Sequence, residues 1–101
     1  MVITDLTTDA LIRIRVEGIS LRKETTQEIK EVVKAHLAKK ARDISFDLQS
    51  VQFIDSMSIG MLLYFAHLQK RSGHRVRIEA ASAELKSLLR TIALDFLLHD
   101  P

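Results

Sequence analysis

A stretch near the N-terminus decides the fold class: Ala10-Leu11-Ile12-Arg13-Ile14-Arg15-Val16. Its β-branched residues fall on one side and its arginines on the other, which is typical of a strand with one buried face. The same alternation recurs in residues 44–48 and 75–79. Strands of a parallel sheet covered on both faces would be apolar throughout. The sequence therefore predicts a two-layer α/β domain in which helices cover mainly one face of the sheet.

Helical periodicity occupies the segments between these strands. Thr25 and Glu28 match a capping box, and the apolar stripe after them predicts a helix that ends near Lys40. Gly73 is expected to end a second helix, and Ser82 is expected to cap a third helix with a leucine stripe.

An N-terminal strand at residues 1–4 completes the predicted fold by pairing with residues 10–16. The result is a mixed sheet of about four strands, covered mainly on one face by three or four helices. No repeat, linker or low-complexity tract interrupts the sequence, and 47% hydrophobic with 28% charged residues suit a single core in 101 residues. We therefore expect one domain over residues 1–101.

Composition argues against several function classes. The chain has no cysteine for a disulfide, a thiolate nucleophile or a cysteine-based metal site, and its four histidines lack the spacing of a metal-ligand pair. Fifteen basic and thirteen acidic side chains are scattered, so we expect no nucleic-acid partner. The longest apolar run, residues 59–66, is shorter than the roughly 20 residues that span a bilayer. With no export signal at the N-terminus, we expect a cytoplasmic protein with no membrane contact, no metal and no cofactor.

The segment at Asp55 and Ser56 carries the functional information. It follows the strand at residues 44–48 and begins the second helix, so either side chain can accept hydrogen bonds from free amides of the first turn. A second interpretation starts from the position of Ser56 at the carboxyl edge of the sheet and at the positive end of a helix. A phosphate there would be stabilised by those amides and would add about −1.5 to −2 charges beside Asp55. The residues alone leave both interpretations open.

This junction resembles the signature of the STAS domain family: Phe46-Asp47-Leu48-Gln49-Ser50-Val51-Gln52-Phe53-Ile54-Asp55-Ser56, followed by Ile59-Gly60. The resemblance covers nearly the whole chain, and small bacterial members of the family are anti-sigma-factor antagonists. It implies that a partner serine kinase phosphorylates Ser56 and that a PP2C-like phosphatase removes the phosphate. Asp55 would then cap the helix and orient the site, and Ser58 would cap or bind phosphate.

The same resemblance implies partner switching without enzymatic activity. The unphosphorylated protein would bind a kinase or anti-sigma factor of the GHKL type, and phosphorylation would release it. One departure from the family pattern is Ala93, which replaces a glycine usual near the end of the last helix. We expect it to reshape that turn, because alanine tolerates a positive φ poorly.

The second helix has an apolar stripe that packing on a sheet does not require: Met57, Met61, Tyr64 and Leu68, at spacing i, i+4, i+7 and i+11. Methionine with tyrosine suits a protein interface, so we expect partner contact there, with Ser20 and Leu21 adding to it. Alternatively, neighbouring helices bury this stripe. Two other functions remain open: a STAS regulator of another output such as biofilm polysaccharide production, and a structural STAS subunit of a stressosome or lipid-transport complex.

Overall fold

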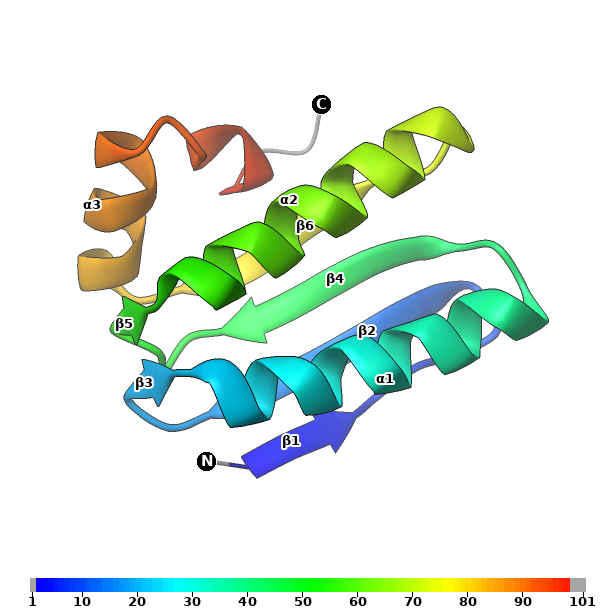
Figure 1. Ribbon diagram of the computed structural model, residues 1–101, viewed down its shortest axis with the longest axis horizontal. Helices are drawn as coiled ribbons and strands as arrows, with labels where there is room; N and C mark the ends of the chain where they lie inside the picture. The colour runs from blue at the N-terminus through cyan, green and yellow to red at the C-terminus, as the bar shows by residue number, and fades with distance from the viewer. Residues whose placement is uncertain (1, 99–101) are drawn as a thin grey trace.

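A mixed four-stranded sheet forms one layer of the molecule. The computed structural model describes residues 2–98. The sheet has the order β1-β2-β4-β6 and consists of β1 (Val2–Asp5), β2 (Leu11–Glu17), β4 (Asp43–Leu48) and β6 (Val76–Ala81). β1 is antiparallel to β2, whereas β2, β4 and β6 are parallel (Figure 1). The predicted mixed sheet is confirmed, including its N-terminal strand.

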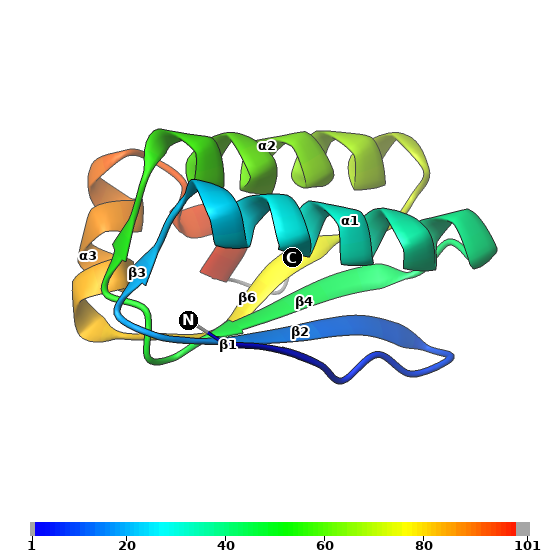
Figure 2. The ribbon, with the colours of Figure 1, turned by 60° about the horizontal axis from the view of Figure 1, so that its bottom comes forward.

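Helices form the second layer, on one face of this sheet. The helices are α1 (Lys23–Lys39), α2 (Ser56–Arg71), α3 (Ala83–Thr91) and the 3-10 helix η1 (Asp95–Leu98). α1 and α2 lie side by side over the sheet, and η1 packs against β6 (Figure 2). The predicted two-layer arrangement is confirmed. A separate parallel pair, β3 (Ser20–Leu21) and β5 (Phe53–Ile54), leads into α1 and α2 and lies outside the predicted elements.

Alternation along the strands separates a buried face of the sheet from a charged face. β2 buries its β-branched side chains under the helices, while its two arginines lie on the helix-free face. There Arg13 Nε donates to Glu79 Oε1 at 2.7 Å, and Arg15 Nε donates to Asp47 Oδ2 at 3.0 Å. Cross-strand ion pairs, rather than a second layer of helices, thus occupy the middle of this face.

The start of α1 differs from the prediction. The helix begins at Lys23, ahead of Thr25, and its N-cap Arg22 makes no side-chain capping hydrogen bond within the described residues. Thr26 donates its backbone N–H to the Arg22 carbonyl at 2.9 Å, which closes the first turn. The predicted capping box is wrong because the pairing of β3 with β5 fixes where the chain enters the helix.

α2 and α3 end in the same backbone motif. After α3, Leu94 donates its N–H to the Leu89 carbonyl at 2.7 Å, which is the six-residue bond of a Schellman ending. Ala93 lies just before Leu94 with a φ of 61°, and the equivalent residue after α2 is Gly73, with a φ of 79°. Gly73 thus ends α2 as expected, while Ala93 is held in a backbone conformation that favours glycine.

Exchanging these two residue types should therefore change stability in opposite directions. We expect Ala93→Gly to stabilise the domain by about 1 kcal/mol and Gly73→Ala to destabilise it by a similar amount. A Cβ at Gly73 would meet no atom within 4 Å, so the conformation of the backbone alone causes the loss. Thermal unfolding should show shifts of roughly 4 to 8 °C in each direction. Shifts of the same sign would contradict this account.

Candidate functional site

The N-terminus of α2 is capped by Asp55. This helix end lies at the same end of the molecule as β3, β5 and the carboxyl end of β4 (Figure 1). Asp55 Oδ1 accepts hydrogen bonds from the Ser58 backbone N–H at 2.9 Å and from Ser58 Oγ at 2.8 Å. The Asp55 backbone N–H donates to the Leu21 carbonyl at 3.3 Å. The predicted capping role of Asp55 is confirmed.

Amides from both helices hold the Asp55 carboxyl in its ionised form. The backbone N–H of Ser58 does most to lower the pKa of this carboxyl below its usual value, against a smaller opposing effect of burial. The Ser58 hydroxyl and the backbone N–H groups of Lys23 and Met57 lower the pKa further. Lys23 begins α1, so the carboxylate lies between the positive ends of α1 and α2.

This lowered pKa predicts a pH-dependent contribution to stability. Because the folded-state pKa lies below the unfolded value of about 3.9, ionised Asp55 stabilises the fold above that pH and loses its contribution as the pH falls through the folded-state pKa. The free-energy difference between the parent and Asp55→Asn should be largest at neutral pH and should shrink below about pH 4. Urea unfolding over a pH series measures it, and a constant difference would contradict this assignment.

The hydroxyl of Ser58 is enclosed where the two helices meet. The residue is 0% exposed, and its Oγ lies 2.7 Å from Thr26 Oγ1 of α1 and 3.1 Å from the Leu21 carbonyl oxygen. Together with its contact to Asp55, these bonds join β3 and the first turns of α1 and α2. Of the two roles expected for Ser58, capping or phosphate binding, this enclosure does not fit phosphate binding, and the bonds to Asp55 fit support of the cap.

Ser56 differs from Ser58 in being open to a second protein. It is the first residue of α2, directly after the capping carboxylate, and its side chain is exposed. The neighbouring Met57 is 41% exposed. An accessible hydroxyl thus lies between a negative charge and an apolar side chain.

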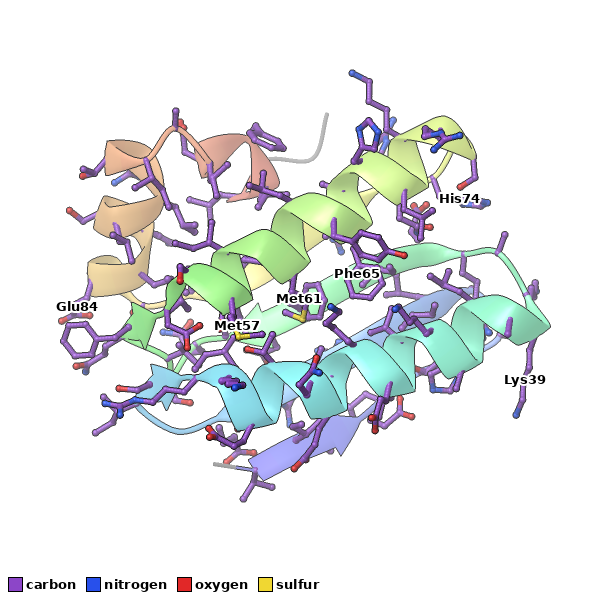
Figure 3. All side chains as sticks on the ribbon, viewed as in Figure 1. Lys39, Met57, Met61, Phe65, His74 and Glu84 are labelled. Carbon is purple, nitrogen blue, oxygen red and sulfur yellow. The ribbon has the colours of Figure 1, made fainter. Side chains whose placement is uncertain are left out.

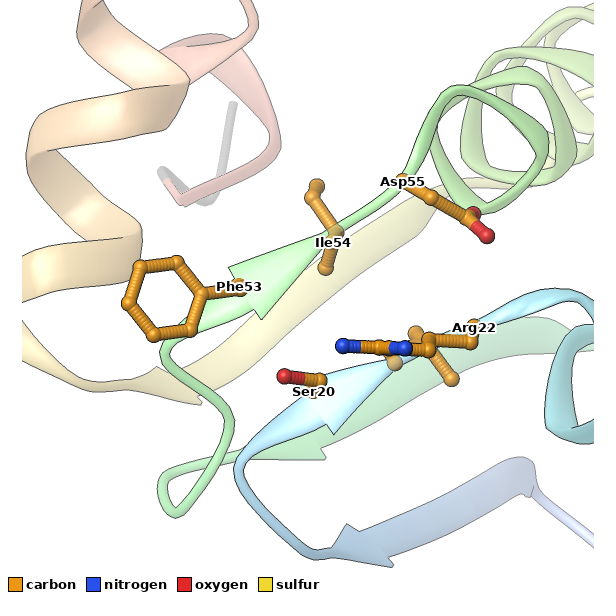
Figure 4. A pocket seen from close by; sticks show the side chains of 6 residues that line it. Ser20, Arg22, Phe53, Ile54 and Asp55 are labelled. Atoms are coloured by element: carbon orange, nitrogen blue, oxygen red, sulfur yellow. The ribbon is translucent and has the colours of Figure 1, made fainter.

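An open pocket of about 540 Å³ lies beside this helix end. It is lined by β3, β5 and the residues that follow them: Ser20, Leu21, Arg22, Phe53, Ile54 and Asp55 (Figure 4). Phe53 is 58% exposed, and Arg22 is exposed as well. The pocket beside this helix end therefore presents an aromatic ring and a guanidinium group in addition to the Asp55 carboxylate.

The sequence matches a protein-family model, and the fold matches a solved structure. A protein-family model described as "Mlab, STAS domain" matches residues 4–99. The chain belongs to the STAS domain family. A solved structure with the same fold is that of the anti-sigma factor antagonist SpoIIAA in its unphosphorylated form, at 17% sequence identity and a TM-score of 0.77, covering 99% of this chain and 88% of that one. Among curated proteins, none matches the sequence.

The STAS domain exposes part of the apolar stripe predicted on α2. Tyr64 is 46% exposed, Met57 is exposed to a similar extent, and Leu68 is half-buried. Two ammonium groups of α1 lie near the Tyr64 ring, Lys30 Nζ at 5.8 Å and Lys34 Nζ at 5.4 Å from its centroid. Met57 and Tyr64 are thus accessible to a partner along the border between α1 and α2.

Met61 and Leu21 are corrections to the predicted partner surface. Met61 is 2% exposed and lies between α2 and α1 (Figure 3). Leu21 is buried in the same core cluster. α1 covers the side of α2 that carries Met61, and β3 turns Leu21 inward. Both side chains stabilise this domain instead of contacting a partner, whereas half-buried Ser20 lines the pocket.

Three residues near the site, Phe53, Lys30 and Lys34, lie outside the sequence-based prediction. Phe53 belongs to a strand of two residues, which is too short to produce a periodic signal. Lys30 and Lys34 are typical of a solvated helix face, and only their proximity to Tyr64 places them at the site. The i, i+4 spacing of these lysines is the signal that could have found them.

The described residues offer neither a metal site nor a membrane span. Within residues 2–98, no three histidine, aspartate or glutamate side chains gather as metal ligands would. Of the helices in that range, none is both long and apolar enough to cross a bilayer.

Proposed function

We propose that this STAS domain is a phosphorylation-controlled partner-switching regulator. When Ser56 is unphosphorylated, the domain binds a regulatory protein in the cytoplasm, and a partner serine kinase causes release by phosphorylating Ser56. The observation that carries the proposal is the exposed Ser56 hydroxyl at the first residue of α2, between ionised Asp55 and exposed Met57.

Phosphorylation at this position would weaken an interface without unfolding the domain. A phosphate adds about −1.5 to −2 charges, and the positive end of α2 stabilises such a charge on the free domain. A partner that packs on Met57 must remove water from that charge, which is costly at an apolar contact. The Asp55 carboxylate adds negative charge at the same place. The phosphate thus opposes binding more than it opposes folding.

The likeness to an anti-sigma factor antagonist supports a particular class of partner. We take the partner to be a serine kinase or anti-sigma factor of the GHKL type, and a PP2C-like phosphatase to restore the binding form. The domain itself then catalyses no reaction. Its output is transcription or another process such as polysaccharide production, according to the target of the released partner.

A negative charge at Ser56 should weaken partner binding without destabilising the fold. We expect Ser56→Asp to weaken partner binding by at least about tenfold, because the carboxylate must be desolvated beside Asp55, and Ser56→Ala to retain binding. The partner is recovered from the native cell with the Ser56→Ala protein as bait and identified. Its affinity for each purified variant is then measured by calorimetry.

The matched control is Ser87→Asp, which adds the same charge to an exposed serine on α3. This variant should bind the partner as the parent does. Equal affinity of the Ser56→Asp and Ser56→Ala proteins would reduce Ser56 to a surface residue of the helix start and would refute the switch. Mass spectrometry of the protein from its native cell should place a phosphate on Ser56.

A second candidate is a structural STAS subunit of a stressosome or a lipid-transport complex, which uses the same surface without a phosphate cycle. The matched family model leaves this candidate open, because its description, "Mlab, STAS domain", does not name an anti-sigma factor antagonist. A subunit of this kind should co-purify with its complex whether residue 56 is Ser, Ala or Asp. The Ser56→Asp measurement therefore distinguishes the two candidates.

A further inference from the structure

Apart from Lys39 in the last turn, the charged residues of α1 are divided between its two exposed sides. Helical spacing places three lysines on the side nearest α2, as the contact of two of them with Tyr64 shows: Lys23, Lys30 and Lys34. The same spacing places three exposed glutamates on the side turned away from α2: Glu24, Glu28 and Glu31. The side of α1 that borders α2 is therefore cationic.

Next to this cationic side of α1, the exposed surface of α2 carries apolar groups. The helix sequence, residues 56–71, contains no aspartate or glutamate. Beyond Ser56 it exposes the side chains of Met57, Leu63, Tyr64, His67, Lys70 and Arg71. We name the exposed border between the helices the α1–α2 seam, and it consists of Met57, Tyr64, Lys23, Lys30 and Lys34.

We propose that the α1–α2 seam docks an acidic amphipathic helix of the partner protein, an inference that rests on the proposed function. Apolar side chains of that helix pack on Met57 and Tyr64, which are exposed to nearly half of their full extent. Its carboxylates face the lysines of α1. Recognition of an amphipathic helix by a groove, with complementary charge at the edge, is a recurring mode of protein recognition.

An anionic membrane fits the seam less well than a helix does. The apolar part is narrow, because lysines border Tyr64 along α1. An amphipathic helix that lies on a bilayer buries its apolar face about 5–10 Å deep. A single partner helix requires only a narrow apolar line flanked by charge.

The seam also gives a physical reason for release by phosphorylation. Ser56 precedes Met57 at one end of the seam, where Asp55 already carries a negative charge. A phosphate on Ser56 extends that negative charge toward the surface on which the carboxylates of the partner lie. Like charges facing each other across an interface oppose binding.

Two synthetic helices with the same leucine face test the charge preference of the seam. One has glutamate and the other has lysine on its polar face, and NMR titration of the full chain measures affinity and locates the contact. The glutamate peptide should bind with shifts at Met57, Tyr64 and the α1 lysines, and the lysine peptide should bind at least about tenfold more weakly. The double variant Lys30→Glu, Lys34→Glu should reverse this preference.

The matched control changes two lysines away from the seam, Lys39→Glu with Lys86→Glu, and should bind the glutamate peptide as the parent does. Equal binding of the two peptides, or shifts centred elsewhere, would overturn the inference. So would binding to vesicles of phosphatidylcholine and phosphatidylglycerol in the absence of peptide binding. Ser56→Asp in the same titration tests the switch separately. If it binds the glutamate peptide like the parent while the lysine variants do not, the docking surface stands and the switch fails.

Discussion

Met61→Glu should lower the melting temperature of the STAS domain by at least about 10 °C. Met61 lies in the core between α2 and α1, with 2% of its surface exposed (Figure 3). A carboxylate at this position loses its hydration, which costs roughly 3 to 5 kcal/mol in the absence of a partner charge. The whole domain is stabilised by only about 5 to 15 kcal/mol. Thermal unfolding followed by circular dichroism measures the loss.

Two control variants separate the effect of burying a charge from the effect of replacing the methionine. Met57→Glu introduces the same carboxylate one turn earlier, at an exposed position, and should melt within a few degrees of the parent. Met61→Leu keeps the apolar volume and should cost less than about 1.5 kcal/mol. If Met61→Glu melted like Met57→Glu, Met61 would face solvent and would rejoin the partner surface.

The division of this stripe between core and surface is not available from the sequence. α2 is apolar on nearly all sides, so its periodicity does not show which side a neighbouring helix covers. Met57 and Met61 are one turn apart and equally apolar. The position of α1 decides between them, and that position depends on how both helices pack on the sheet.

Local patterns were sufficient for the main elements of the fold. Alternation in residues 10–16 predicts both β2 and the single helical layer, because the arginines between its buried residues need a face without helices. Ser82 caps α3 as expected, accepting a hydrogen bond from the Leu85 N–H at 3.1 Å. The start of α1 could not be predicted in this way, since the pairing of β3 with β5 joins segments far apart in the chain.

The candidate site likewise combines a local feature that the sequence predicts with a long-range feature that it does not. Asp55 could be recognised as a cap because the bond to Ser58 is local, within three residues. The burial of Ser58 could not, because Thr26 and Leu21 enclose it from other elements. Long-range contacts therefore distinguish the two serines at this helix end, which the sequence presents as near neighbours of the same chemistry.

Replacement of serine by aspartate should therefore have the second large effect on stability at enclosed Ser58 and almost none at exposed Ser56. Ser58→Asp would place a carboxylate in an enclosed site, next to the ionised carboxylate of Asp55. The new group loses its hydration and opposes a like charge. It also removes the hydroxyl that joins Thr26 to Asp55.

Ser58→Asp should therefore cost at least about 3 kcal/mol, a fall in melting temperature of more than about 10 °C. Ser56→Asp should melt within a few degrees of the parent, because its carboxylate is exposed at the positive end of α2. Thermal unfolding of both variants and of Ser58→Ala measures the difference, and Ser58→Ala isolates the loss of the hydroxyl, about 1 to 3 kcal/mol. A stable Ser58→Asp protein would show that this serine also accepts charge while folded, and Ser56 would no longer be distinguished as the acceptor. An unstable one restricts a reversible charge switch at this helix end to Ser56.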